Sequence, residues 1–272
     1  MEKYSVLMSL YIKEKPEYLK MAIDSILVQT LLPNEIVIVK DGRITKDLEN
    51  VLNEYTQKYK NLFKVVGYEE NKGLGLALNY GLRYCSNDLV ARMDTDDISK
   101  PERCRAQVER FMLETDLAIV GSNVDEFIGD ISNVVSRRIV PSEYTKIYEF
   151  AKRRSAFNHP SVMYRKSKVL EFGGYSNLRR NQDVDLFGRM LFGGCKATNI
   201  QESLLWYRLD DNLSKRRKSW ENTWSYITTI MRLWKLGYSS LLDFIVVCAA
   251  QSTMYIIPIS LQNYLYRKFL RT

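Results

Sequence analysis

The sequence predicts an α/β protein with a mostly parallel central sheet flanked by helices. Two observations support this: short apolar runs alternate with amphipathic segments over residues 4–128, and polar or acidic residues directly follow several of the runs. Such alternation brings the carboxyl ends of parallel strands to one edge, where ligands bind. With 46% hydrophobic and 26% charged residues in 272, the composition excludes the disordered, collagen-like and coiled-coil classes.

The predicted elements follow one another in order. Apolar runs predict strands over residues 4–10, 35–39, 63–66, 89–93, 118–121 and 124–128. Helical spacing of apolar residues predicts helices within residues 16–29, 48–59 and 74–85, and Pro16 suits a first helical turn. Ser99 and Glu102 have the spacing of a capping box, so a fourth helix is predicted to begin at Pro101 and to continue to Met112.

Cysteine and histidine usage limits the chemistry. The four cysteines are far apart and form no C-x-x-C pair. This argues against a zinc ribbon or a disulfide scaffold, and we expect free thiols in a reducing compartment. His159 is the only histidine, which excludes mechanisms that need two or three. Any chemistry must therefore rest on carboxylates.

The net charge of +8 is unevenly distributed. Residues 1–136 hold 17 Lys and Arg against 22 Asp and Glu, whereas residues 137–272 hold 23 against 10. The basic half suggests an anionic partner, and the charge alone fits nucleic acid, acidic lipid or a phosphorylated substrate. The chain shows no nucleic-acid module and its front half is acidic, so we expect no nucleic acid and favour an acidic membrane surface.

The two ends of the sequence bear on location. No targeting peptide opens it, so a cytoplasmic protein is expected. Residues 244–266 form 23 positions without a charge, which is long enough to span a bilayer. Seven polar or proline residues dilute this segment, so we expect it to lie on the membrane surface, with a packed helical lid as the alternative. A tryptophan-rich stripe over residues 220–234 predicts an amphipathic helix before it.

Three carboxylates, Asp94, Asp96 and Asp97, directly follow the strand predicted over residues 89–93. They repel one another unless a cation lies among them, and Mn²⁺ or Mg²⁺ is the natural partner of such oxygen ligands. In an extended segment Asp94 and Asp96 face the same way. The alternative is a helix N-terminus whose acids, Asp97 above all, only complement the helix dipole. No P-loop or EF-hand pattern occurs.

Eight short motifs follow one another along residues 4–235. They are Ser9-Leu-Tyr11, Val39-Lys-Asp41-Gly42, Asn71-Lys-Gly73-Leu-Gly75, Ala91-Arg-Met-Asp94-Thr-Asp96-Asp97, Phe157-Asn158-His159-Pro160-Ser161-Val162-Met163, Gly173-Gly174-Tyr175, Gln182-Asp183-Val184-Asp185-Leu186 and Tyr207-Arg208. Together and in this order they resemble family 2 glycosyltransferases of GT-A fold. The likeness is nearest to bacterial enzymes that assemble O-antigen, capsule and other surface polysaccharides.

This resemblance implies a nucleotide-sugar site at the first strand ends. Asp41 would accept a hydrogen bond from a uracil ring, with Ser9 and Tyr11 lining the same pocket. Asp94 would face the ribose and diphosphate, and Asp96, with Asp94 beside it, would hold the Mn²⁺ or Mg²⁺ ion that neutralises charge on the departing UDP. From the sequence alone, Asp41 is equally well interpreted as a turn residue before a glycine.

The resemblance also implies an acceptor side. An inverting transfer needs a base that takes the proton from the acceptor hydroxyl, and Asp183 matches the family's catalytic position. Gln182 stands where the family often has Glu, and Asp185 is the nearest rival for the base.

Other residues would organise this side of the site. Asn158 and His159 would bind the acceptor or order the site, although a single histidine is often structural. Asp97 and Arg208 belong to the same group. Many relatives carry a histidine after the Tyr-Arg pair; this sequence lacks it, which leaves Arg208 and Lys215 to steady the diphosphate.

We therefore expect a GT-A catalytic domain over residues 1–236, with a nucleotide-sugar half (1–128) and an acceptor half (129–236), and a helical membrane-associating segment over residues 237–272. The expected activity is an inverting, metal-dependent transfer of a hexose, galactose or glucose, from a UDP-sugar to a saccharide on polyprenyl diphosphate at the inner face of the membrane. One alternative is a nucleotidyltransferase acting on sugar phosphates, although the glycine-rich loop it would need is absent near the N-terminus. The other is a non-catalytic module that binds saccharide or nucleic acid.

Overall fold

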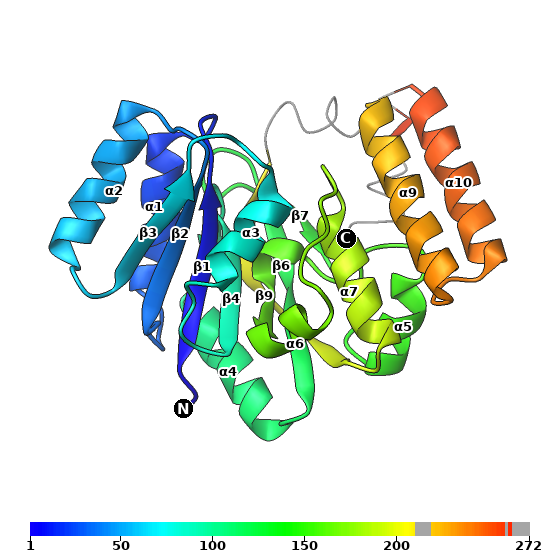
Figure 1. The fold of residues 1–272 in the computed structure, drawn as a ribbon, viewed down its shortest axis with the longest axis horizontal. Helices are drawn as coiled ribbons and strands as arrows, with labels where there is room; N and C mark the ends of the chain where they lie inside the picture. Colours follow the sequence, from blue (N-terminus) through cyan, green and yellow to red (C-terminus); the bar gives the residue numbers. More distant parts are fainter. Residues whose placement is uncertain (210–218, 259–260, 263–272) are drawn as a thin grey trace.

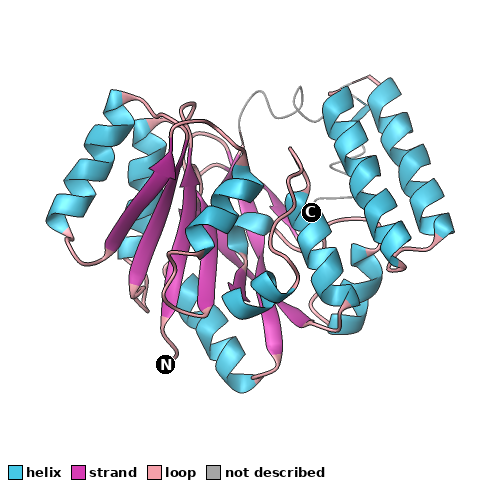
Figure 2. Ribbon diagram, viewed as in Figure 1, coloured by secondary structure: helices cyan, strands magenta, loops and turns pink. Residues whose placement is uncertain are grey.

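A computed structural model describes residues 1–209, 219–258 and 261–262. Its centre is one sheet with the strand order β3-β2-β1-β4-β8-β6-β9-β5, and β7 pairs with β6 beside this path. Helices lie against both faces, which confirms the α/β class (Figure 1, Figure 2). The strands are β1 Tyr4–Leu10, β2 Glu35–Asp41, β3 Phe63–Tyr68, β4 Leu89–Asp94, β5 Ile98–Ser99, β6 Leu117–Phe127, β7 Val134–Arg138, β8 Met163–Arg165 and β9 Lys196–Arg208.

The helices cover the two faces of the sheet in two groups. Helices α1, α2 and α4 share a core with Val6 and Met8 of β1. Helices α3, α5, α6, α7, α9 and α10 share the opposite core, which contains Leu7. The division follows from the strand, because successive side chains point to opposite faces. Their bounds are α1 Pro16–Leu27, α2 Lys46–Lys58, α3 Leu74–Leu82, α4 Arg103–Leu113, α5 Tyr144–Ala151, α6 Lys166–Glu171, α7 Gln182–Phe192, α9 Trp220–Leu236 and α10 Leu241–Ile256.

The sheet is mixed, so the prediction of a mostly parallel sheet holds for its first four strands and for the pair β6 and β9, but not for the rest. Strands β3, β2, β1 and β4 are all parallel. The three-residue strand β8 then enters antiparallel between β4 and β6, and β5 and β7 are also antiparallel to their partners. Such short strands carry no apolar run for a sequence pattern to detect.

Two local predictions were wrong. The runs at 118–121 and 124–128 belong to one buried strand, β6, because Ser122 and Asn123 between them find partners inside the protein: the Ser122 carbonyl accepts from Asn158, and the Asn123 amide donates to the Gln201 carbonyl. The capping box is absent. Ser99 lies in β5, its N–H donates to the Ser25 hydroxyl, and α4 begins only at Arg103.

The C-terminal part forms two helices side by side at one end of the molecule (Figure 1). Helix α9 confirms the amphipathic stripe, and Gly237 ends it with a φ of 93°. Helix α10 starts with a capping box of Ser240 and Asp243, and it packs on α9 through Trp234 and Phe244, whose stacked rings lie 5.4 Å apart. Among the described residues, no helix combines the length and apolarity needed to cross a bilayer.

Candidate active site

The predicted carboxylates gather at the carboxyl end of β4. Asp94, Asp96 and Asp97 each offer a ligand oxygen, and these oxygens all lie within 4.8 Å of one another. Glu14 adds a fourth carboxylate through Thr95, whose hydroxyl donates to it at 2.7 Å. The local sequence forces this grouping, because the chain leaves β4 and turns into β5 within four residues.

The charge in this cluster is only partly balanced by protein. Both oxygens of Asp94 accept from the guanidinium of Arg92, which is 1% exposed. Asp97 is buried; one oxygen accepts the backbone N–H of Arg208 at 2.9 Å, and the other is buried with no partner among the described residues. This unpartnered oxygen beside two more carboxylates fits a hard divalent cation.

The raised pKa values of Asp96 and Asp97 reflect the same excess of negative charge. Burial, followed by the charges of Asp94 and Glu14, raises the pKa of Asp96 to about 7. Burial and the neighbouring carboxylates also raise the pKa of Asp97 well above its ordinary value. Without a cation, these carboxylates therefore bind a proton more readily than usual. This is expected of a carboxylate cluster that binds a cation.

The predicted nucleotide residues meet at the same edge of the sheet. Register places Ser9 of β1 opposite Asp94 of β4, and one residue later Leu10 lies opposite Lys40, which precedes Asp41. Tyr11 follows β1 and is 39% exposed. The structure thus brings the residues of the predicted uracil pocket together.

Asp41 itself is heavily engaged. Its carboxylate accepts from the Tyr68 hydroxyl, the Asn71 amide, and the backbone N–H groups of Lys72 and Gly73, at 2.8–3.1 Å. The next residue, Gly42, has a φ of +87°, and a Cβ there would meet the Asn71 nitrogen at 2.7 Å. Asp41 therefore ties the Asn-Lys-Gly motif to β2, and a bond to uracil stays a prediction.

The two carboxylates of α7 have separate surroundings. Burial raises the pKa of Asp183, and the Arg92 guanidinium opposes this effect, so Asp183 lies within electrostatic reach of the carboxylate cluster. Asp185, two residues on, lies 2.9 Å from Arg189 and 3.7 Å from Arg232. Asp185 is thus bound in ion pairs with two arginines, whereas Asp183 feels the charges of Arg92 and Asp94.

His159 and Asn158 form hydrogen bonds with segments that surround this site. His159 lies 3.0 Å from the Tyr175 hydroxyl, and burial lowers the pKa of the histidine well below its ordinary value. It is therefore a neutral ring that orients Tyr175, whose backbone is held by Asn79. Asn158 donates to the Ser122 carbonyl at 2.9 Å and anchors the His-Pro turn to β6. Both residues thus hold neighbouring segments by hydrogen bonds, and a role in binding the acceptor or organising the site stays a prediction.

Arg208 braces the carboxylate loop from β9. Its Nε donates to the Asp96 carbonyl at 2.8 Å and a terminal nitrogen donates to the Gly129 carbonyl at 3.1 Å. The guanidinium also lies over the rings of Tyr18 and Phe127, at 4.0 and 4.6 Å. Its predicted contact with a diphosphate has no support in these bonds, and Lys215 lies outside the described residues.

Sequence reasoning missed Arg92 as a site residue. This guanidinium hydrogen-bonds to Asp94, and its charge also acts on Asp97 and Asp183. A signal was present, because an arginine in the middle of an otherwise apolar strand must have a buried partner.

Comparison with known proteins agrees with this geometry. The sequence model described as "Glycosyl transferase family 2" matches residues 5–178. The chain is 35% identical, over 99% of its length and 97% of the relative, to an Escherichia coli protein named UDP-Gal:alpha-D-GlcNAc-diphosphoundecaprenol beta-1,3-galactosyltransferase. It is also 35% identical to the amylovoran biosynthesis glycosyltransferase AmsE of Erwinia amylovora, over 86% of this chain and 85% of that one.

A solved structure resembles the fold. The mannosyltransferase PcManGT of Pyrobaculum calidifontis, in complex with GDP-Man and Mn²⁺, superposes with a TM-score of 0.61 at 13% identity, over 97% of this chain and 85% of that chain. The fold is therefore of the GT-A type, an α/β nucleotide-sugar transferase fold. From the family match and the full-length relatives together, this chain belongs to glycosyltransferase family 2.

Proposed function

We propose that this protein is an inverting, metal-dependent transferase that moves a hexose from a UDP-sugar to a saccharide carried on a lipid diphosphate, in the synthesis of a bacterial surface polysaccharide. Galactose is favoured over glucose as the hexose, because the E. coli relative is named as a galactosyltransferase. The observation that carries the proposal is the cluster of Asp94, Asp96 and Asp97, whose Asp94 is held by Arg92, a buried guanidinium whose charge also acts on the base candidate Asp183. The relatives favour this activity over a nucleotidyltransferase or a binding module.

Asp94, Asp96 and Asp97 would hold the divalent ion, Mn²⁺ or Mg²⁺. When bound, the ion acts as a Lewis acid that stabilises negative charge on the departing UDP. Arg92 holds the Asp94 carboxylate in place by its two hydrogen bonds. Ser9, Tyr11 and Asp41 would bind the uridine, with Asp41 fixed by the loop it holds.

Asp183 would remove the proton from the acceptor hydroxyl as that oxygen attacks the anomeric carbon from the face opposite UDP. Burial raises the pKa of Asp183 and therefore strengthens it as a base. The single displacement inverts the anomeric centre. His159 and Asn158 would keep the Tyr175 loop beside this base.

The proposal includes contact of the C-terminal segment with the membrane. The outward face of α10 exposes Leu241, Leu242, Ile245, Val246 and Ile256, and these side chains are 41–77% exposed. We expect residues 237–272 to rest on the inner face of the membrane, beside a catalytic domain over residues 1–236, where a lipid-linked acceptor is available.

The test is UDP release by the purified protein from a panel of UDP-sugars, with Mn²⁺ or with EDTA, and with or without a GlcNAc-diphospho-lipid. Release that requires one donor, the metal and the acceptor supports the proposal. Absence of both UDP release and UDP binding under every condition would refute it.

A further inference from the structure

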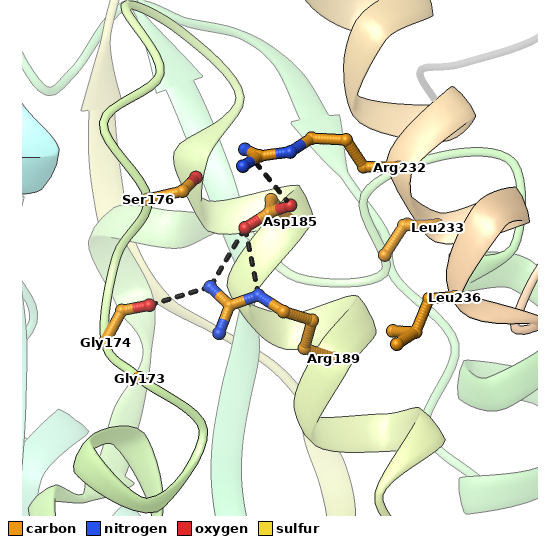
Figure 3. Close-up of a pocket in the computed structure, with 8 residues that line it drawn as sticks. All are labelled: Gly173, Gly174, Ser176, Asp185, Arg189, Arg232, Leu233 and Leu236. Carbon is orange, nitrogen blue, oxygen red and sulfur yellow. Dashed lines mark hydrogen bonds and ion pairs between the residues drawn. The ribbon is translucent and has the colours of Figure 1, made fainter.

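A pocket lies on the side of α7 opposite to the base candidate Asp183. It has a volume of about 300 Å³ and is formed by the Gly173–Ser176 loop, α7 and α9 (Figure 3). Asp183 and Asp185 are two residues apart on a helix, so they point to nearly opposite sides, and Asp185 lies in the pocket wall. The Gly173–Ser176 loop contacts both sides. Its Tyr175 contacts His159 beside the candidate active site, while Gly174 and Ser176 line the pocket.

The polar wall of the pocket carries more positive than negative charge. Arg189 and Arg232 face a single carboxylate, Asp185, whose side chain is 4% exposed. Arg189 is held in place by Asp185 and by the carbonyls of Phe172 and Gly174.

Arg232 is bound much more loosely than Arg189. Its side chain is 48% exposed and meets Asp185 only at 3.7 Å, and within the described part of the chain it has no other partner. Most of its N–H donors are therefore available to an anion.

Two further features of the pocket indicate which kind of ligand it binds. The hydroxyl of Ser176 is buried without a hydrogen-bond partner among the described residues, and Figure 3 shows it directed into the pocket. The opposite wall is apolar and consists of Leu233 and Leu236 of α9. A buried donor, an available guanidinium and two leucines fit a molecule with an anionic head joined to an apolar chain.

We infer that this pocket binds the diphosphate and the first isoprenoid unit of the acceptor, with Arg232 and Ser176 on the diphosphate and Leu233 and Leu236 on the hydrocarbon. The inference rests on the proposed function, which puts the acceptor sugar at Asp183. An α-helix with its side chains is about 10–12 Å thick, so the sugar and its diphosphate need only reach around one turn of α7. The hydrocarbon then leaves along α9 toward α10 with its exposed apolar residues.

The test measures binding of farnesyl diphosphate to the full-length protein by calorimetry, with UDP and Mn²⁺ present to fill the donor site. Arg232→Gln is expected to weaken this binding at least tenfold, Arg232→Lys less, and Ser176→Ala about threefold. Arg83→Gln, a loss of one exposed arginine at the C-cap of α3, is the matched control and should leave farnesyl diphosphate binding unchanged. Unchanged UDP affinity in each variant shows that the fold is intact.

Three outcomes overturn the inference: no binding by the wild type, equal binding by wild type and Arg232→Gln, or equally tight binding of inorganic pyrophosphate, which would mark a simple phosphate site. Farnesol is expected to bind far more weakly than the diphosphate. Because binding needs no turnover, a wild type that binds through Arg232 but transfers no sugar would keep the pocket and reject the proposed function. If the wild type transfers sugar but Arg232→Gln leaves farnesyl diphosphate binding unchanged, the proposed function is kept and the pocket is rejected.

Discussion

Replacing Asp183 with asparagine tests the proposed base with almost no change in side-chain volume. General-base catalysis contributes about 10²–10⁴ in rate, so kcat is expected to fall by that factor, which corresponds to about 3–5 kcal/mol of transition-state stabilisation. The KM for the UDP-sugar should stay within a fewfold of the wild type, because Asp183 lies on α7 and the predicted uridine residues lie on the strand ends.

The structure also predicts the effect of this substitution on stability. Burial raises the pKa of Asp183 in the folded protein, so its charged form opposes folding at neutral pH, and the neutral asparagine should leave Tm unchanged or higher. Asp185→Asn should do the opposite, because it breaks the 2.9 Å ion pair with Arg189. Losing a charged hydrogen bond costs about 1.5–3 kcal/mol, which at 2–4 °C per kcal/mol lowers Tm by roughly 3–12 °C.

The assay is initial-rate UDP release together with calorimetric melting of each variant. Asp47→Asn, an exposed carboxylate in the first turn of α2, is the control for a helix-terminal acid and should match the wild type in both measurements. A wild-type kcat in Asp183→Asn would show that Asp183 is not the base. A hundredfold loss of kcat confined to Asp185→Asn would move the base to that residue.

Other predictions concern the metal, the core and the membrane face. Asp96→Asn should abolish Mn²⁺-dependent turnover and weaken Mn²⁺ binding by calorimetry while the protein stays folded; a wild-type Mn²⁺ affinity would remove the metal assignment. Gly81→Ala places a Cβ 2.4 Å from Leu7 and should cost about 1–3 kcal/mol in urea unfolding, whereas an unchanged midpoint would contradict the close packing of α3 on β1. Leu242→Lys with Ile245→Lys should abolish flotation with anionic vesicles, and flotation at the wild-type level would exclude this face of α10 as the contact.

The front half of the fold was predictable because its pattern is local. Each of the four parallel strands is a short apolar run, and each helix between them carries one apolar stripe, so period alone identifies them. The carboxylate cluster was found for the same reason: Asp94, Asp96 and Asp97 are close in sequence and directly follow β4.

The rest depended on contacts between distant segments. Strand β8 has three residues and β5 only two, so their pairing is decided by the partner strands and leaves no periodic signal. Ser99 fitted a capping box by spacing, yet it lies in β5 and its N–H donates to the hydroxyl of Ser25 on α1. The role of Arg92 needed the fold to bring Asp183 of α7 near β4.

The most direct test of the central claim is the anomeric configuration of the transferred sugar. Proton NMR would follow a single turnover of UDP-α-galactose with Mn²⁺ and a GlcNAc-diphospho-lipid, and then with UDP-α-glucose. We expect a β-linked product with one of these donors, no product in EDTA, and product formation slowed by about 10²–10⁴ in Asp183→Asn. An α-linked product would contradict single displacement by an acceptor activated at Asp183, and a metal-independent β-linked product would contradict the role given to the carboxylates at the end of β4.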